Sequence, residues 1–171
     1  ILYERLYLCC FMNFLEKIPS SSKVWVEKPL TGLDDEALRA MTNIKTQNNL
    51  DIHCGLLKRS IAKKVKHTKP YFRYVCNVPK QANWKNIVPG GENWVDGVHA
   101  IDFYNFLNHG FDDTDIEVKE NQITLKSTLT NSSVLIGQTG YDALHVNGED
   151  FSKFLGYDYS QKFLSDQFKS F

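Results

Sequence analysis

A run of forty residues between Asp51 and Glu92 contains no acidic side chain and nine lysine or arginine side chains. Aromatic rings are interleaved with these cations. Ammonium and guanidinium groups contact phosphates while neighbouring rings stack on bases, and phosphate contacts supply most nonspecific affinity for nucleic acid. The segment therefore predicts a nucleic-acid-binding surface, DNA or RNA. Its candidate residues are Lys58, Arg59, Lys63, Lys64, Lys66, Lys69, Arg73, Tyr71 and Trp84.

A block of opposite charge follows directly. The thirty residues from Glu92 to Asn121 carry eight carboxylates against the single lysine Lys119, and the whole chain balances 20 basic with 20 acidic residues. One alternative is therefore that the basic face pairs with the acidic block inside the protein. This pairing would leave little unneutralised positive charge to attract a ligand. Another is that a basic amphipathic helix lies on an anionic membrane or binds a regulatory partner.

Two enzyme classes are weaker alternatives. A thiol protease needs a cysteine nucleophile, a histidine base and an orienting carboxylate, for which Cys54, His145 and Asp158 stand in a workable order without a recognisable signature. A metal-dependent nuclease needs an Asp and a Glu-x-Lys, for which Glu117 and Lys119 qualify together with Asp102 or Asp113 upstream. Any amphipathic strand offers that spacing, so we assign no catalytic residue, metal ligand or cofactor.

The cysteines predict the compartment. Four occur, at positions 9, 10, 54 and 76, with no C-x-x-C spacing, and the adjacent Cys9 and Cys10 have poor geometry for a disulfide with each other. We interpret them as reduced thiols. The apolar N-terminal run is too short to span a bilayer and lacks the features of a secretory signal. We expect an intracellular protein, located in cytoplasm, nucleus or virus particle, without a transmembrane segment.

The elements that must position the cations follow from periodicity. In the first half we expect a helix ending near residue 18, a strand over 23–27, a helix opening at residues 34–36 and a strand over 71–78. Leu57, Ile61 and Val65 lie four residues apart, with lysine and arginine on the remaining positions, which predicts a basic amphipathic helix. The Pro, Gly and Trp residues between Pro79 and Trp94 indicate a domain boundary.

The second half predicts strands and short helices. Residues 115–120 and 123–128 alternate polar and apolar side chains, as a half-buried hairpin does, and residues 134–137 form a further strand candidate. Two segments share Asp-x-x-His followed by Asp-Phe-x-x-Phe-Leu, namely 96–107 and 142–155, with a two-residue insertion in the second. Each suits an Asp N-cap before a short helix, which suggests a duplicated unit.

A stretch near the C-terminus resembles a known family. Residues 144–157 read LHVNGEDFSKFLGY and are continued by Ser160 to Leu164. This stretch is similar to the core of the Bro-N and KilA-N domains of large DNA viruses and phages, in which a strand leads into an Asp-capped helix ending in Leu-Gly-Tyr and a second helix follows. The resemblance covers about 25 residues of 171 and implies a viral or phage DNA-binding protein.

These observations predict an α+β protein with a helical basic region over 1–91 and a mixed strand and short-helix region over 92–171 that contains two similar strand–helix units. We expect a non-catalytic nucleic-acid-binding module that uses the basic helix and the adjacent aromatic strand. The alternatives are a structural protein that associates with itself in a larger assembly, and the metal-dependent nuclease.

Overall fold

The computed structural model describes residues 11–26, 35–56, 58–65, 70–78, 91–119 and 122–170. It confirms the α+β class. The chain divides into two compact units, one comprising Ile1–Gly55 and Ala82–Val95 and the other Leu56–Gln81 and Asp96–Phe171. The predicted boundary at residues 91 and 92 falls within a single helix, α4 (Gly91–Asn108).

The first unit contains a β-α-β arrangement. Strands β1 (Lys23–Val26) and β2 (Asp51–Cys54) pair in parallel, from Lys23 opposite Asp51 to Val26 opposite Cys54, and α2 (Asp35–Gln47) connects them. Residues 11–16 form a further helix. One cluster of buried side chains comes from the helix over 11–16, from β1, from α2 and from the residue before β2; its members are Leu15, Val24, Val26, Met41, Ile44 and Leu50.

The second unit is built on a six-stranded mixed sheet. Its strands are β3 (Phe72–Asn77), β4 (Thr114–Lys119), β5 (Gln122–Ser127), β6 (Ser133–Gly137), β7 (Ala143–Val146) and β8 (Glu149–Asp150), in the spatial order β4-β5-β6-β3-β7-β8. Strands β3 and β6 are parallel, and every other pairing is antiparallel. The hairpin and the strands predicted at 71–78 and 134–137 are confirmed.

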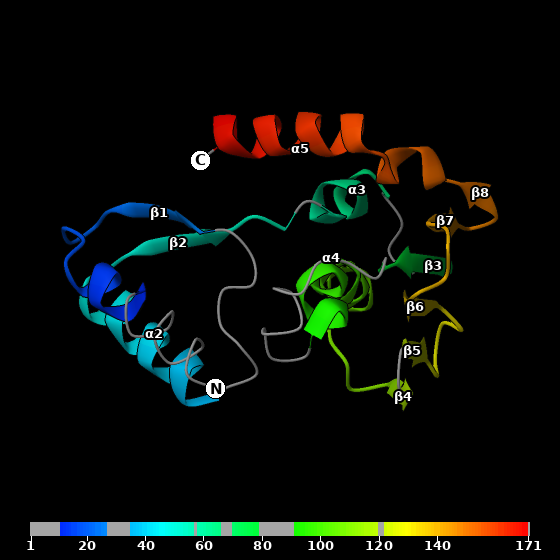
Figure 1. The fold of residues 1–171 in the computed structure, drawn as a ribbon, viewed down its shortest axis with the longest axis horizontal. Helices are drawn as coiled ribbons and strands as arrows, with labels where there is room; N and C mark the ends of the chain where they lie inside the picture. The colour runs from blue at the N-terminus through cyan, green and yellow to red at the C-terminus, as the bar shows by residue number, and fades with distance from the viewer. Residues whose placement is uncertain are drawn as a thin grey trace. The chain divides into compact units, whose positions relative to one another are not determined.

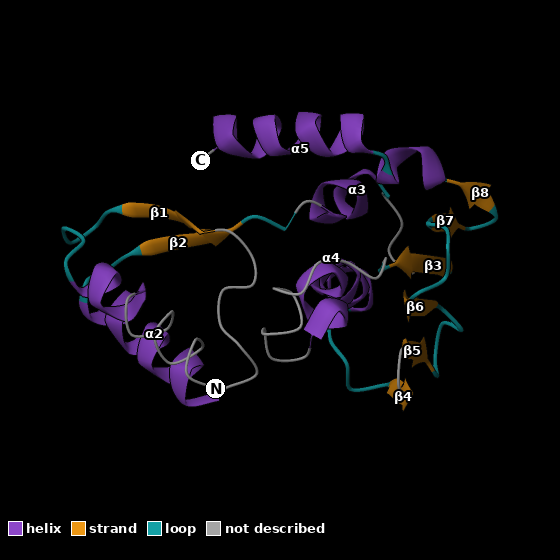
Figure 2. Cartoon of the chain, viewed as in Figure 1, coloured by secondary structure: helices purple, strands orange, loops and turns teal. Residues whose placement is uncertain are grey.

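The helices of this unit lie on one face of the sheet (Figures 1 and 2). They are α3 (Lys58–Lys64), α4, the 3₁₀ helix η2 (Ser152–Leu155) and α5 (Tyr157–Ser170). Phe72 on β3 is fully buried, and its ring meets those of Phe103 and Tyr104 on α4 edge to face, with centroids 5.4 and 5.9 Å apart. We call this side the helix-covered face.

The opposite side, which we call the open face, carries the alternate residues of each strand. Arg73 is exposed there, whereas its neighbours Phe72 and Tyr74 are buried. The strand register places Arg73 between Ser133 on β6 and His145 on β7. Lys126 on β5 lies beyond Ser133 in the same row. This row of the open face is therefore polar, whereas the next row holds Val75, Leu135 and Ala143.

The predicted internal duplication does not exist as a structural repeat. Residues 96–107 are helical throughout, inside α4, whereas residues 142–155 form β7, β8 and η2. The two inserted residues explain the difference. Asn147 and Gly148 adopt φ values of 50° and 84°, which suit a two-residue hairpin turn, so the second segment folds back as a hairpin.

Candidate functional site

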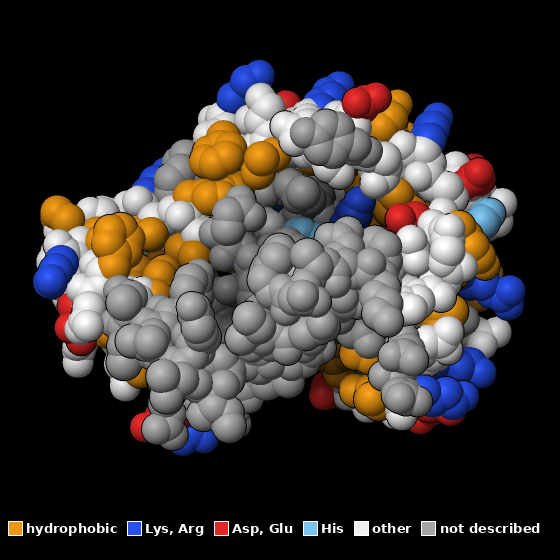
Figure 3. Space-filling view, in the orientation of Figure 1, with side chains coloured by type: hydrophobic (Ala, Val, Ile, Leu, Met, Phe, Trp, Pro, Cys, Tyr) orange, Lys and Arg blue, Asp and Glu red, His pale blue; other side chains and the backbone are white. Residues whose placement is uncertain are grey.

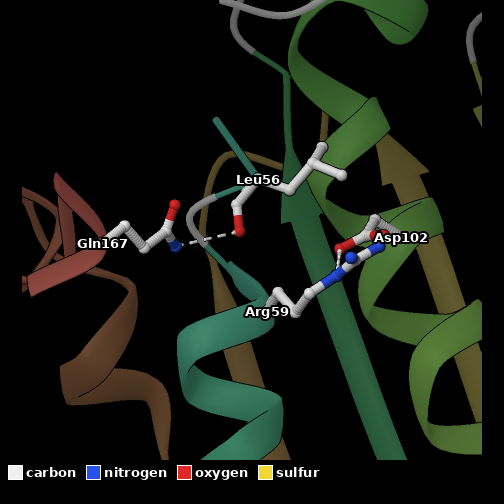
Figure 4. A network of polar contacts seen from close by, with 4 residues as sticks. All are labelled: Leu56, Arg59, Asp102 and Gln167. Carbon is white, nitrogen blue, oxygen red and sulfur yellow. Dashed lines mark hydrogen bonds and ion pairs between the residues drawn. The ribbon is translucent and has the colours of Figure 1, made fainter. Parts of the chain in front are cut away.

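Two of the predicted nucleic-acid-binding residues, Lys58 and Arg59, are engaged inside the second unit. Lys58 donates a hydrogen bond from Nζ to the carbonyl oxygen of Leu155 at 3.1 Å. Arg59 forms an ion pair with Asp102 on α4, with Nε 3.1 Å from Oδ2 and a second nitrogen donating to Oδ1. Figure 4 shows the guanidinium of Arg59 directed at this carboxylate. Both cations therefore already have partners within the second unit.

The Arg59 and Asp102 pair corrects the prediction that Asp102 caps a short helix. Helix α4 begins at Gly91, so Asp102 lies within its interior, and its side chain is only 8% exposed. A carboxylate so far from water needs a charge partner, and a bidentate guanidinium is the strongest one available. The basic and acidic blocks of the sequence therefore do pair within the protein at this point.

Burial also affects Lys58. It lowers the pKa of the Lys58 ammonium below the ordinary value of 10.5, and the nearby charge of Asp142 acts in the opposite direction. The hydrogen bond to Leu155 ties the start of α3 to the end of η2. A partly desolvated ammonium that already donates to a backbone carbonyl is poorly suited to contacting phosphate.

The remaining described candidates lie on two different surfaces. Lys63 and Lys64 are exposed on α3, and the Nζ of Lys64 lies 5.6 Å from the ring centre of Phe163 on α5. Arg73 is on the open face, where its guanidinium lies 5.8 Å from the ring centre of Tyr71. Helix α3 packs on the helix-covered face, so these two sets do not form one continuous surface.

Three predicted residues, Lys66, Lys69 and Trp84, lie outside the described part of the chain. On the face drawn in Figure 3, the Lys and Arg side chains of the described residues are interspersed with Asp and Glu side chains.

In the nuclease alternative, Asp113 directly precedes the strand that carries Glu117 and Lys119, whereas Asp102 lies apart from them. Glu117 and Lys119 form an ion pair at 2.8 Å on the open face of β4. Asp102 belongs to α4, on the helix-covered face, and is held by Arg59. In the protease alternative, Cys54 belongs to the first unit, whereas His145 and Asp158 belong to the second. Within the described residues, no cluster of His, Cys, Asp and Glu has the arrangement of a metal site.

A group that the sequence brought forward only as part of the supposed repeat is better placed for chemistry. His99 lies on α4, and residues three or four positions apart share one side of a helix, so it is on the same side as Asp102 and Phe106. Its ring is half-buried, with Nδ1 fully buried. Imidazole is the side chain that ordinarily gains and loses a proton near neutral pH.

The helix that carries His99 is held at two points, one on each side of this residue. At Gly97 the helix approaches β6 so closely that a Cβ added there would lie 2.6 Å from Cγ2 of Ile136. One turn beyond His99, the Arg59 and Asp102 pair joins α4 to α3. A half-buried titratable group on an anchored helix is a candidate for general acid–base catalysis, because productive proton transfer depends on positioning.

Comparison with known proteins supplies one structural likeness. No protein-family profile and no curated protein matches the sequence. A solved structure from Thermotoga maritima, described as a "putative oxidoreductase", aligns with 82% of this chain at a TM-score of 0.52 and 13% identity. The alignment covers 54% of that protein, so this chain spans about half of its length. At this identity the likeness concerns the fold.

No described helix is long and apolar enough to cross a membrane.

Proposed function

We propose that this chain supplies the substrate-side acid–base group of an oxidoreductase, and that the group is His99. The observation that carries the proposal is a half-buried imidazole on the anchored helix α4, in a fold that resembles the Thermotoga maritima protein. Fold alone does not imply function, so the proposal depends on this residue and its surroundings.

The chemistry assigned to His99 is one proton transfer. When an alcohol is oxidised to a carbonyl compound, the carbon loses hydrogen with its bonding electron pair as hydride to an acceptor, and the hydroxyl oxygen loses a proton. Neutral His99 would take that proton, and protonated His99 would return it when a carbonyl group is reduced. Asp102 is already neutralised by Arg59, so it leaves no net charge one turn away.

The sequence lacks the glycine pattern that commonly cradles the pyrophosphate of a dinucleotide. The parallel β1-α2-β2 arrangement occurs in dinucleotide-binding sheets, but those sheets cradle pyrophosphate with Gly-x-Gly-x-x-Gly, which this sequence does not contain. We therefore assign no step to a cofactor, and the proposal concerns the proton alone.

The test is an activity screen of the full chain. Small alcohols, hydroxy acids and sugars are offered with nicotinamide or flavin acceptors, and turnover is followed across pH. We expect His99→Gln to lower kcat by about 100-fold or more and to remove one limb of the pH profile. His145→Gln, which changes an exposed imidazole on the open face, is the control. Unchanged kcat and pH profile in His99→Gln would contradict the proposal, as would a screen in which no compound reacts or shifts the His99 NMR resonance.

A second candidate, nucleic-acid binding, keeps support from the cations that the fold leaves exposed. Among the described residues, Lys63, Lys64 and Arg73 are exposed and take part in no ion pair. We propose that, if the chain binds nucleic acid, α3 contributes Lys63 and Lys64, and the open face contributes Arg73 with the ring of Tyr71.

Affinity for single-stranded and duplex oligonucleotides across a salt series tests this candidate. We expect Lys63→Gln with Lys64→Gln to weaken binding and to reduce the salt slope by about two, one for each phosphate contact. Lys162→Gln with Lys169→Gln on α5 is the matched control, because it also removes two exposed charges. Affinity that is absent at low salt or independent of salt rejects the candidate.

A further inference from the structure

Strand β4 is an unprotected edge among the described strands of the sheet. Its only described strand neighbour is β5, and the other side of its backbone pairs with no described strand. The register with β5 is continuous from Thr114 opposite Ser127 to Lys119 opposite Gln122, so no bulge interrupts the edge. An edge of this kind is a template for pairing with another strand.

The side chains of β4 leave apolar surface at this edge. Ile116 and Val118 are opposite Leu125 and Ile123 in the register, which places them on the helix-covered face. Ile116 is nevertheless 59% exposed and Val118 72% exposed. Asp115, Glu117 and Lys119 alternate with them on the open face. The edge thus has one apolar side and one charged side.

The charge order of β4 identifies the partner. We propose that β4 pairs antiparallel with β4 of a second copy of this chain, about a twofold axis at Glu117. This register sets Asp115 opposite Lys119 of the partner subunit and Ile116 opposite Val118 of the partner subunit, and the twofold axis repeats both pairs. Opposite charges and apolar side chains facing each other across strands are the favourable combinations.

Neighbouring registers are poorer. An axis at Ile116 would set Asp115 opposite Glu117, which is repulsive. An axis at Val118 would set Glu117 opposite Lys119, which is attractive, but it would leave Ile116 opposite no described residue of β4 and keep one apolar pair in place of two. A one-residue slip would join the helix-covered face of one copy to the open face of the other. At the proposed axis the two Glu117 side chains face each other, but the ammonium of Lys119 lies 2.8 Å from the carboxylate in each copy and limits their repulsion.

The test measures the mass of the full chain in solution by sedimentation over a range of concentrations. We expect the mass to rise toward twice 19.7 kDa. Asp115→Lys and Lys119→Asp should each weaken association tenfold or more, because each turns two attractive pairs into repulsive ones. Lys162→Asp, a charge reversal on α5, should leave association unchanged.

Mixing the two single variants separates loss of the contact from loss of folding. In a mixed dimer every position 115 and position 119 again faces the opposite charge, so an equimolar mixture should associate within about threefold of the wild type. A misfolded variant would not recover on mixing. A wild-type chain that stays monomeric at all concentrations, single variants that associate like wild type, or a mixture no better than its components would each overturn the proposal. None of these outcomes depends on the activity of His99.

Discussion

Arg59 on α3 holds Asp102 on α4 through hydrogen bonds to both carboxylate oxygens, and the same guanidinium lies 5.8 Å from the ring centre of Phe106. The pair joins the basic and acidic blocks of the sequence inside one unit. It also fixes the helix that carries His99. One contact therefore removes a cation from any nucleic-acid surface and positions a candidate acid–base group.

This pair makes a prediction about stability. Arg59→Met leaves a buried carboxylate without its partner, and we expect the free energy of unfolding to fall by about 2 kcal/mol. That is below the cost for a fully buried pair because the Arg59 side chain is 43% exposed. Replacing both residues, as Arg59→Met with Asp102→Leu, should cost less than the sum of the single changes. Additive losses in urea denaturation would show that the two residues are not coupled.

Replacing Gly97 with alanine should change the stability in the direction opposite to the one that helix propensity alone predicts. Alanine favours a helix over glycine by about 1 kcal/mol. At Gly97, however, the new methyl group would lie 2.6 Å from Cγ2 of the fully buried Ile136, and overpacking costs about 1 to 3 kcal/mol. We expect a net loss of stability in Gly97→Ala, and Gly97→Ala should cost less in an Ile136→Ala background than in the wild type, because the clash is then absent. In Gly156→Ala, the control, the nearest atom would be 3.7 Å away, so the melting temperature should hardly change.

The lowered pKa of Lys58 predicts that the free energy of unfolding depends on pH in the alkaline range. Burial lowers its pKa below 10.5, so just below pH 10.5 the unfolded lysine binds more proton than the folded one. The free energy of unfolding therefore rises with pH in that window. Lys58→Met lacks this contribution, and wild type should gain stability relative to the variant as the pH approaches 10.5. A pH-independent difference between the two proteins in urea titrations would refute this assignment.

The lowered pKa of Asp150 predicts that the free energy of unfolding depends on pH in the acid range. The side chain and backbone N–H of Ser152 lower the pKa of Asp150 below 3.8, and the N–H donates to Oδ1 at 2.7 Å. The folded carboxylate is favoured, so its stabilisation is present above pH 3.8 and is lost as the pH falls through the folded pKa. Asp150→Asn should remove this part of the acid unfolding curve. Glu149→Gln, on the neighbouring exposed residue, is the control.

Periodicity in the sequence was sufficient for most elements. Alternation predicted the hairpin of β4 and β5, and apolar spacing predicted α3 and its basic surface. It did not predict that α4 runs for 18 residues from Gly91. This helix is buried on more than one side, because the sheet covers Phe103 and Tyr104 and α3 contacts Asp102. An amphipathic pattern is absent when more than one side of a helix is buried.

The sequence by itself determined the α+β class, the charge blocks and the alternating strands, because these depend on residue type and local spacing. Only the tertiary structure decided which charges remain available. Lys58 and Arg59 lie within one short helix with Lys63 and Lys64. Lys58 is held by Leu155, 97 residues away, and Arg59 by Asp102, 43 residues away. Lys63 and Lys64 are exposed. Neutralisation of a charge depends on distance in space, which the order of residues along the chain does not specify.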